Sequence, residues 1–229
     1  DVLVDGLDET EVYLGERIAP GSFGWLVPLS GSRALVGLIS RQSLNGHLGR
    51  FLATLQMDGK VKQVIRKPRR WGIPLKPLTR TYGDRVLAVG DAAGLVKPTT
   101  GGGIYYALLS GELAAETVDD AFLAGEFSAR QLKNYQKRWK ALFGREVSVG
   151  YYARTLYEAL GDQRVEILLS AFSSCGAQEE LINSGEFSFD WHSKVILKAL
   201  RHRRLGSLIR SFGPVATPFL SQLAGVRFW

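Results

Sequence analysis

The sequence predicts an α+β fold: an antiparallel sheet, one strand–turn–helix element and a helical carboxy-terminal region. Three observations support this prediction. Short aromatic and β-branched runs dominate residues 1–84, a glycine-rich turn joins a strand-like run to a helical run within 85–126, and apolar residues recur at helical spacing through 127–229. We therefore expect three consecutive parts with these boundaries.

Residues 1–84 are predicted to form the sheet, because strand-like runs alternate there with turn-forming residues. The turn-like stretch 30–33 separates two of these runs, so we expect the two runs to pair as an antiparallel hairpin. Within 44–57, leucine and phenylalanine recur at amphipathic spacing, which predicts one helix. Strands are expected at 11–14, 23–29, 34–39 and 61–65.

The middle part begins with the compact apolar run 85–89, which predicts a buried strand. From Gly103 onward, alanine and leucine predict a helix that reaches about residue 124. In the last part, Ser128 and Gln131 form a capping-box signature that marks the start of a helix. Further helices are expected at 147–160, 163–174, 192–203 and 205–212.

The composition is that of a globular protein with a sizeable core, since 45% of the 229 residues are hydrophobic and 22% are charged. No run of 18 or more apolar residues occurs, so the sequence predicts no membrane-spanning helix. The single cysteine, Cys175, excludes an internal disulfide framework. The three histidines are scattered without metal-ligand spacing, and we predict no metal site.

The net charge of +7 is compatible with nucleic acid, an anionic membrane surface or small phosphorylated ligands as partners. Because the basic residues form no recognised nucleic-acid-binding motif, we do not expect nucleic-acid binding. Segment 194–229 mixes basic and apolar residues, which indicates either peripheral contact with anionic lipid or a helical cap packed on the domain. No signal-peptide pattern opens the chain, which predicts a cytoplasmic location, with or without that membrane contact.

The strongest chemical signal is the segment Val89–Gly103, in which a strand-like run leads through a glycine-rich turn into a helix. Gly90 allows close approach of a ligand to the backbone, and Asp91 places a carboxylate where it can accept hydrogen bonds from sugar or ribityl hydroxyls. The run 101–103 is three glycines at a helix start, which exposes backbone N–H groups to an anion or an electron-rich ring edge. A tight turn without a ligand is the alternative interpretation.

The segment 89–107 resembles the second flavin motif of the geranylgeranyl reductase family, a group of FAD enzymes built like para-hydroxybenzoate hydroxylase. The segment 19–28, Ala-Pro-Gly-Ser-Phe-Gly-Trp-Leu-Val-Pro, is similar to the aromatic-Gly/Ala-Trp-x-x-Pro strand of that family. The helix expected around 135–146 is similar too, and the resemblance covers roughly residues 10–160.

This resemblance implies that 1–84 binds substrate, that 85–126 binds FAD and that the reaction is saturation of isoprenoid double bonds. It assigns no catalytic residue. It implies a flavin site at Gly90, Asp91, Gly94, Pro98, Gly101, Gly102 and Gly103, and a substrate-binding site at Phe23, Trp25 and Pro28.

The sequence departs from the family in one respect: no Gly-x-Gly-x-x-Gly motif that would hold the FAD pyrophosphate is present. We therefore expect Asp1 to be an internal start and this chain alone to be inactive. Two alternatives remain open. One is a flavin-dependent monooxygenase or halogenase, although Phe23 stands where halogenases favour a second tryptophan. The other is a non-enzymatic fragment that binds a lipid surface or a partner.

Overall fold

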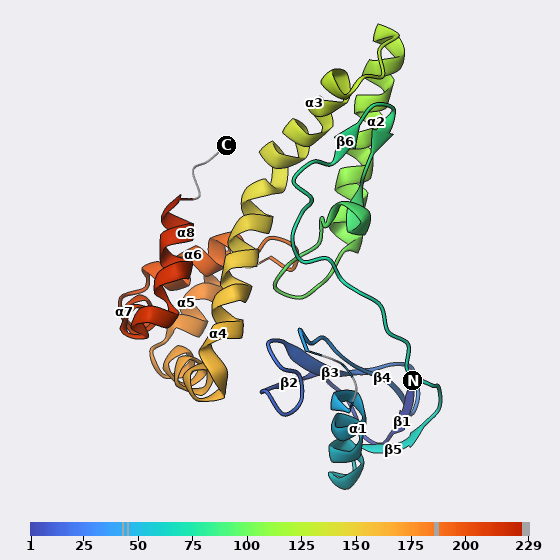
Figure 1. Ribbon diagram of the computed structural model, residues 1–229. Coiled ribbons are helices and arrows are strands. Elements are labelled where there is room, and N and C mark those ends of the chain that lie inside the picture. The colour runs from blue at the N-terminus through green and yellow to red at the C-terminus, as the bar shows by residue number, and fades with distance from the viewer. Residues whose placement is uncertain (43, 45, 186–187, 226–229) are drawn as a thin grey trace. The chain divides into compact units, whose positions relative to one another are not determined.

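The computed structural model describes residues 1–42, 44, 46–185 and 188–225 (Figure 1). The chain divides into two compact units, each with its own hydrophobic core. The first unit comprises Asp1–Trp71 together with Tyr157–Ile167, and the second comprises Gly72–Leu156 together with Leu168–Trp229.

The first unit is built on a five-stranded antiparallel sheet with the strand order β2-β3-β4-β1-β5. The predicted hairpin is present as β3 and β4, and one helix, α1, packs on the sheet (Figure 1). The amino-terminal strand β1 was not predicted from the sequence, because it is only three residues long. The elements are β1 (Val2–Val4), β2 (Glu11–Leu14), β3 (Phe23–Pro28), β4 (Arg33–Leu38), α1 (His47–Met57) and β5 (Val61–Val64).

Strand register gives the sheet two different faces, because side chains alternate along each strand. Leu26 lies opposite Val36 on the face that packs against α1, where Phe51 and Leu55 are fully buried. Trp25, one residue away, lies on the outer face. The outer face also carries Val12, Leu14, Phe23 and Leu35, and three of these, Val12, Leu14 and Leu35, are exposed.

Residues 157–167 complete the first unit through polar contacts with the loops beside β3. The Tyr157 hydroxyl donates to the Ser22 carbonyl oxygen at 2.8 Å, and the Asp162 carboxylate accepts from the Glu16 N–H at 2.9 Å. Gly161 has a φ of 68°, which interrupts the helical path of α4 at this point. The two helices expected at 147–160 and 163–174 therefore flank a real break in the backbone.

The second unit is mostly helical, with a two-stranded antiparallel ribbon at its start. Helices α2 and α3 lie side by side, and a π-helical turn joins α3 to α4 without a gap (Figure 1). The short helices α5 and α8 were not predicted. The elements are β6 (Tyr82–Gly83), β7 (Val86–Leu87), the 3-10 turn η1 (Gly90–Ala93), α2 (Ile104–Ala124), α3 (Ala129–Trp139), the π turn η2 (Lys140–Gly144), α4 (Arg145–Ser174), α5 (Ala177–Asn183), α6 (Ser193–Arg201), α7 (Arg203–Ser211), the 3-10 turn η3 (Gly213–Val215) and α8 (Thr217–Gly225).

The core of this unit holds α2, α3 and α4 together around stacked aromatic rings. Tyr106 and Phe143 stack with ring centroids 5.1 Å apart, and Trp139 lies next to Phe143 at 5.7 Å. As predicted, Ser128 caps α3, its hydroxyl oxygen accepting from the Gln131 N–H at 3.4 Å. No helix within the described ranges is both long enough and apolar enough to cross a bilayer.

The predicted buried strand at 85–89 is wrong in length and in burial. β7 spans Val86–Leu87, pairs antiparallel with β6, and leaves the Val86 side chain 60% exposed. Arg85 adopts a left-handed φ of 59°, so the chain turns immediately before the strand. Among the described residues, only the two residues of β6 pair with the apolar run 85–89. The strand β7 is short for this reason.

The buried side of the sheet is expected to carry the stability of the first unit. Leu26→Ala should lower the free energy of unfolding by about 2–5 kcal/mol, because Leu26 is fully buried and its truncation leaves a cavity. Leu35→Ala, a matched truncation on the outer face, should cost about 1 kcal/mol or less. Chemical denaturation monitored by tryptophan fluorescence measures both, and equal costs would contradict the assignment of the two faces.

Candidate functional site

The glycine-rich segment of the second unit, residues 90–103, forms a compact loop between β7 and α2, here called the glycine loop. Gly90, Gly94 and Gly101 have φ angles of 52°, 70° and 74°, a region in which other residues are strained. Residues 93–98 are buried, whereas Asp91 and Ala92 at the tip of the first turn are exposed. Three of the five glycines singled out in the sequence are therefore required by the backbone path of the loop.

Two close approaches show why side chains are absent at particular positions. A Cβ atom at Gly94 would lie 2.3 Å from the carbonyl oxygen of Lys76, so a neighbouring stretch of backbone occupies that space. The Leu78 N–H donates to the Ala93 carbonyl oxygen at 2.9 Å and fastens the same stretch to the loop. A Cβ atom at Gly103 would lie 2.4 Å from Oδ1 of Asp91, so the Asp91 carboxylate packs directly against Gly103 at the end of the loop.

The Asp91 carboxylate is positioned to receive hydrogen bonds from a ligand. Its side chain is exposed, and within the described part of the chain no side chain or N–H group donates to it. The backbone of the residue is fixed nonetheless, since its carbonyl oxygen accepts from the Gly94 N–H at 2.9 Å. A fixed backbone with an uncommitted carboxylate suits a ligand that brings hydroxyl donors.

The start of α2 lies directly beside this carboxylate and is open. Gly103 is the N-cap residue, and no side chain caps the helix. The first N–H groups of a helix have no intrahelical acceptor and carry the positive end of the helix dipole. Ile104, the first helical residue, is 82% exposed. A hydrogen-bond acceptor or an electron-rich ring edge is therefore favoured at this end of α2.

The fourth predicted loop residue, Pro98, is buried rather than open to a ligand. A Cβ atom at Gly150 would lie 3.2 Å from the Pro98 ring, so the proline packs directly on α4. Arg154, also on α4, donates to the Pro98 carbonyl oxygen at 3.2 Å. Gly102 contacts Lys97, whose Cε atom lies 2.9 Å from where a Cβ atom at Gly102 would be.

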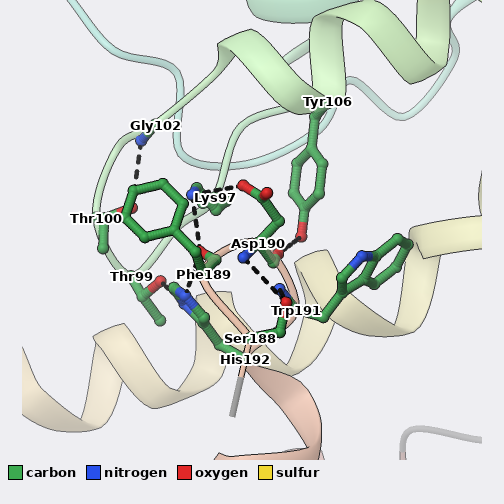
Figure 2. A network of polar contacts seen from close by, with 10 residues as sticks. All are labelled: Lys97, Thr99, Thr100, Gly102, Tyr106, Ser188, Phe189, Asp190, Trp191 and His192. Atoms are coloured by element: carbon green, nitrogen blue, oxygen red, sulfur yellow. Dashed lines mark hydrogen bonds and ion pairs between the residues drawn. The ribbon is translucent and has the colours of Figure 1, made fainter. Parts of the chain in front are cut away.

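Several residues that surround the loop were not singled out in the sequence. The hydroxyl of Tyr106 donates to the carbonyl oxygen of Asp190 at 3.1 Å, and Lys97 pairs with the Asp190 carboxylate at 2.9 Å (Figure 2). Burial, and then the nearby Glu146 and Asp190 carboxylates, raise the pKa of Tyr106 far above its ordinary value, so its hydroxyl remains a donor. These partners lie far apart in the sequence, and no local pattern signals them.

The predicted substrate residues lie in the first unit and fall on two faces of its sheet. Phe23 and Trp25 share the outer face, with ring centroids 5.8 Å apart. A Cβ atom at Gly37 would lie 2.3 Å from the Trp25 ring, so the indole lies flat across β4. Pro28 pairs with Ala34 and lies on the face with the core, because three residues separate it from Trp25.

The glycine loop fits the sugar-alcohol chain and the ring edge of a flavin. Its exposed parts are a carboxylate without a donor, backbone glycines and an uncapped helix start, and these match ribityl hydroxyls and a ring that gains negative charge on reduction. Within the described ranges, no three histidine, cysteine, aspartate or glutamate residues gather as a set of metal ligands.

The close approach at Gly94 predicts a large effect of adding one methyl group. Gly94→Ala should destabilise the protein by clearly more than Gly125→Ala, which should cost about 1–2 kcal/mol for its left-handed backbone. Gly125 has a φ of 64° and open space around its Cβ position, which makes it the matched control. Thermal unfolding of the two variants measures the difference, and equal melting temperatures would show that the Lys76 contact is not tight.

Comparison with known proteins identifies relatives, although no family model matches the chain. A digeranylgeranylglycerophospholipid reductase 2 from Methanothermobacter thermautotrophicus is 34% identical over 166 residues, covering 69% of this chain and 42% of the relative. A digeranylgeranylglycerophospholipid reductase from Methanoculleus marisnigri is 33% identical over 199 residues, covering 80% and 49%. The chain spans about half the length of the curated relatives it matches.

A solved structure extends the similarity to the fold. The geranylgeranyl bacteriochlorophyll reductase-like protein from Thermoplasma acidophilum superposes with a TM-score of 0.70 at 25% identity, and the match covers 93% of this chain and 52% of that one. The mixed fold, with its antiparallel sheet followed by helices, is thus shared with a protein of this kind. With these relatives in sequence and in structure, the chain belongs to the geranylgeranyl reductase family.

Proposed function

We propose that the protein is an FAD-dependent reductase that saturates carbon–carbon double bonds of an isoprenoid lipid. One observation carries the proposal: an exposed carboxylate without a donor, Asp91, lies against the uncapped, glycine-rich start of α2 in a member of this family. The names of the relatives supply the reaction class, and the exposed groups of the loop suit the cofactor.

The glycine loop would hold the flavin through complementary polar groups. Asp91 would accept hydrogen bonds from ribityl hydroxyls, and the first N–H groups of α2, next to Gly103, would stabilise negative charge on the ring edge. Gly90 and Gly94 set the backbone that presents these groups, and Pro98 stiffens the loop by packing on α4. The flavin, once an electron donor has reduced it, would supply the hydride for the reduction.

The outer face of the sheet would bind the isoprenoid chain. An isoprenoid offers no hydrogen-bonding groups along its length, so its recognition depends on apolar contact area. Phe23 and Trp25 provide two aromatic rings on that face, and the exposed Val12, Leu14 and Leu35 extend it. Pro28 would act through the shape of β3, since it lies on the opposite face.

Loss of the Asp91 carboxylate is expected to abolish flavin retention. The full-length protein, purified without added flavin, should show the absorbance bands of an oxidised flavin, and Asp91→Ala should lose them because the ribityl hydroxyls lose their acceptor. Asp119→Ala removes a carboxylate on the exposed side of α2, toward its other end, and should leave the bands unchanged. Colourless wild-type protein that takes up no FAD would refute the cofactor assignment.

The products of the flavin-loaded, full-length protein test the reaction class. Incubated without oxygen with a chemical reductant and a geranylgeranyl lipid, the protein should yield lipid that has gained one pair of hydrogens per double bond, detected by mass spectrometry. Hydroxylated or halogenated product formed only in air would instead identify an oxygen-activating monooxygenase or halogenase.

We also propose that the protein contacts anionic lipid through the basic surface of α6 and α7. From residue 191 to 229 the sequence contains seven lysines and arginines and no aspartate or glutamate. The described residues Lys194, Arg201, Arg203, Arg204 and Arg210 are exposed. The apolar side of α7 is buried, as in a helical cap, so the contact would be electrostatic without insertion. Residues 226–229 of the predicted segment lie outside the described residues.

Reversing two of these charges should weaken membrane binding. Each basic residue near an anionic surface contributes about 1 kcal/mol, so the double variant Arg203→Glu/Arg204→Glu should bind vesicles containing phosphatidylserine at least about 30-fold more weakly. Lys133→Glu/Lys137→Glu makes the same change on exposed positions of α3 and serves as the control. Co-sedimentation measures binding, and equal loss in both variants, or binding to neutral vesicles, would contradict a specific basic surface.

A further inference from the structure

Residues 188–193, here called the strap, run from the carboxy-terminal region across the glycine loop (Figure 2). Lys97 Nζ lies 2.9 Å from Asp190 Oδ1 and donates to the Phe189 carbonyl oxygen at 3.0 Å. Two residues further along the loop, Thr99 Oγ1 lies 2.7 Å from Nδ1 of His192. The strap therefore contacts the loop on both sides of Pro98, through partners 93 residues away in the sequence.

The ammonium group of Lys97 is bound by the strap. Two of its donors reach Asp190 and Phe189, and it lies 4.0 Å from the centroid of the Phe189 ring. The Lys97 side chain is 7% exposed, whereas that of Asp190 is 29% exposed. An ammonium buried to this degree is costly unless it is paired, so the strap and the charged lysine stabilise one another. Most of the hydrogen-bonding capacity of Lys97 is consequently used by the strap.

The same residue closes the glycine loop through its backbone. The Lys97 N–H donates to the Gly102 carbonyl oxygen at 2.8 Å, and the Gly101 N–H donates to the Lys97 carbonyl oxygen at 2.7 Å. Its side chain also packs against Gly102, with Cε 2.9 Å from the Cβ position. A displacement of the Lys97 side chain would therefore move the glycines that lead into α2.

The strap is itself anchored on the helices behind the loop. The buried carboxylate of Glu146, on α4, accepts from the Ser193 N–H at the start of α6. Trp191 packs edge-on against Tyr105 and Tyr106 at the start of α2, with ring centroids 6.0 and 6.3 Å away. Because the strap is fixed to α2 and α4, it can hold Lys97 in one place.

We propose that Lys97 and Asp190 are a positioning pair that sets the conformation of the glycine loop and, through it, the affinity and reduction potential of the flavin. The proposal rests on the proposed function. The N–H groups at the start of α2 would stabilise the negative charge of the reduced ring, so their placement affects the reduced form more than the oxidised form. Neither residue needs to touch the flavin for this effect.

Three variants of the full-length protein test the pair: Lys97→Met, Asp190→Asn and the double variant that combines them. Each single variant should raise the Kd for FAD about tenfold, a typical coupling for residues in contact, and should shift the flavin midpoint potential to a more negative value. Asp120→Asn is the matched control, since it breaks an exposed ion pair with Arg138 between α2 and α3.

The double variant separates positioning from stability. It removes the uncompensated buried charge, so its melting temperature should recover toward the wild-type value, which also keeps the test valid if Asp190→Asn alone fails to fold. Its midpoint potential should nevertheless stay shifted, because the strap no longer holds the loop. Recovery of the potential along with the melting temperature would show a merely structural pair and overturn the proposal.

The outcomes also distinguish this proposal from the proposed function. Wild-type protein that binds FAD, with unchanged Kd and potential in Asp190→Asn and in the double variant, would overturn the positioning pair alone. Wild-type protein that takes up no FAD would overturn both.

Discussion

One close approach between two stretches of backbone governs the arrangement of the glycine loop. The carbonyl oxygen of Lys76 lies 2.3 Å from where a side chain at Gly94 would begin. Only glycine, which has no Cβ atom, fits at this position. The contact fixes the turn after which residues 93–98 are buried, whereas Asp91 before it is exposed. The exposed position of the Asp91 carboxylate, on which the proposed function depends, thus follows from the absence of a Cβ atom at Gly94.

The loop is then held from outside by segments that are distant in the sequence. Pro98 packs on Gly150 and receives a hydrogen bond from Arg154, while Lys97 is neutralised by Asp190. These contacts need no part of the flavin, so the loop can be formed before a ligand binds. A preformed site loses less conformational entropy on binding than a mobile one, which favours tight retention of a cofactor.

The features that could be predicted from sequence are those set by a few consecutive residues. The hairpin of β3 and β4, the Ser128 cap and the break near Gly161 each have a local cause, in alternation, a hydroxyl acceptor and a residue without a Cβ atom. The position of Pro28 could also have been anticipated, because period-two alternation separates it from the face of Trp25.

The features that escaped prediction depend on tertiary contacts. An apolar run at 85–89 indicates burial, but only pairing partners decide how much of it becomes strand, and here β6 offers two residues. The role of Lys97 could not be seen in the local sequence, because its charge is paired with the carboxylate of Asp190, 93 residues away. The sequence therefore singled out the loop that is proposed to bind the cofactor, and it missed the groups that hold this loop in place.

The two units present surfaces of opposite character, and this division suits the proposed reduction of an isoprenoid. In the second unit the exposed groups of the glycine loop are a carboxylate and backbone N–H groups, which form hydrogen bonds of defined direction and suit a polar ligand. In the first unit the outer sheet face offers aromatic and aliphatic area, and Gly37 lets the Trp25 ring lie flat along it. An apolar surface of this kind distinguishes isoprenoid ligands by their shape and length, and hardly by the position of a single double bond. The choice of the double bond to be reduced would then not come from a contact made by this sheet with the bond itself.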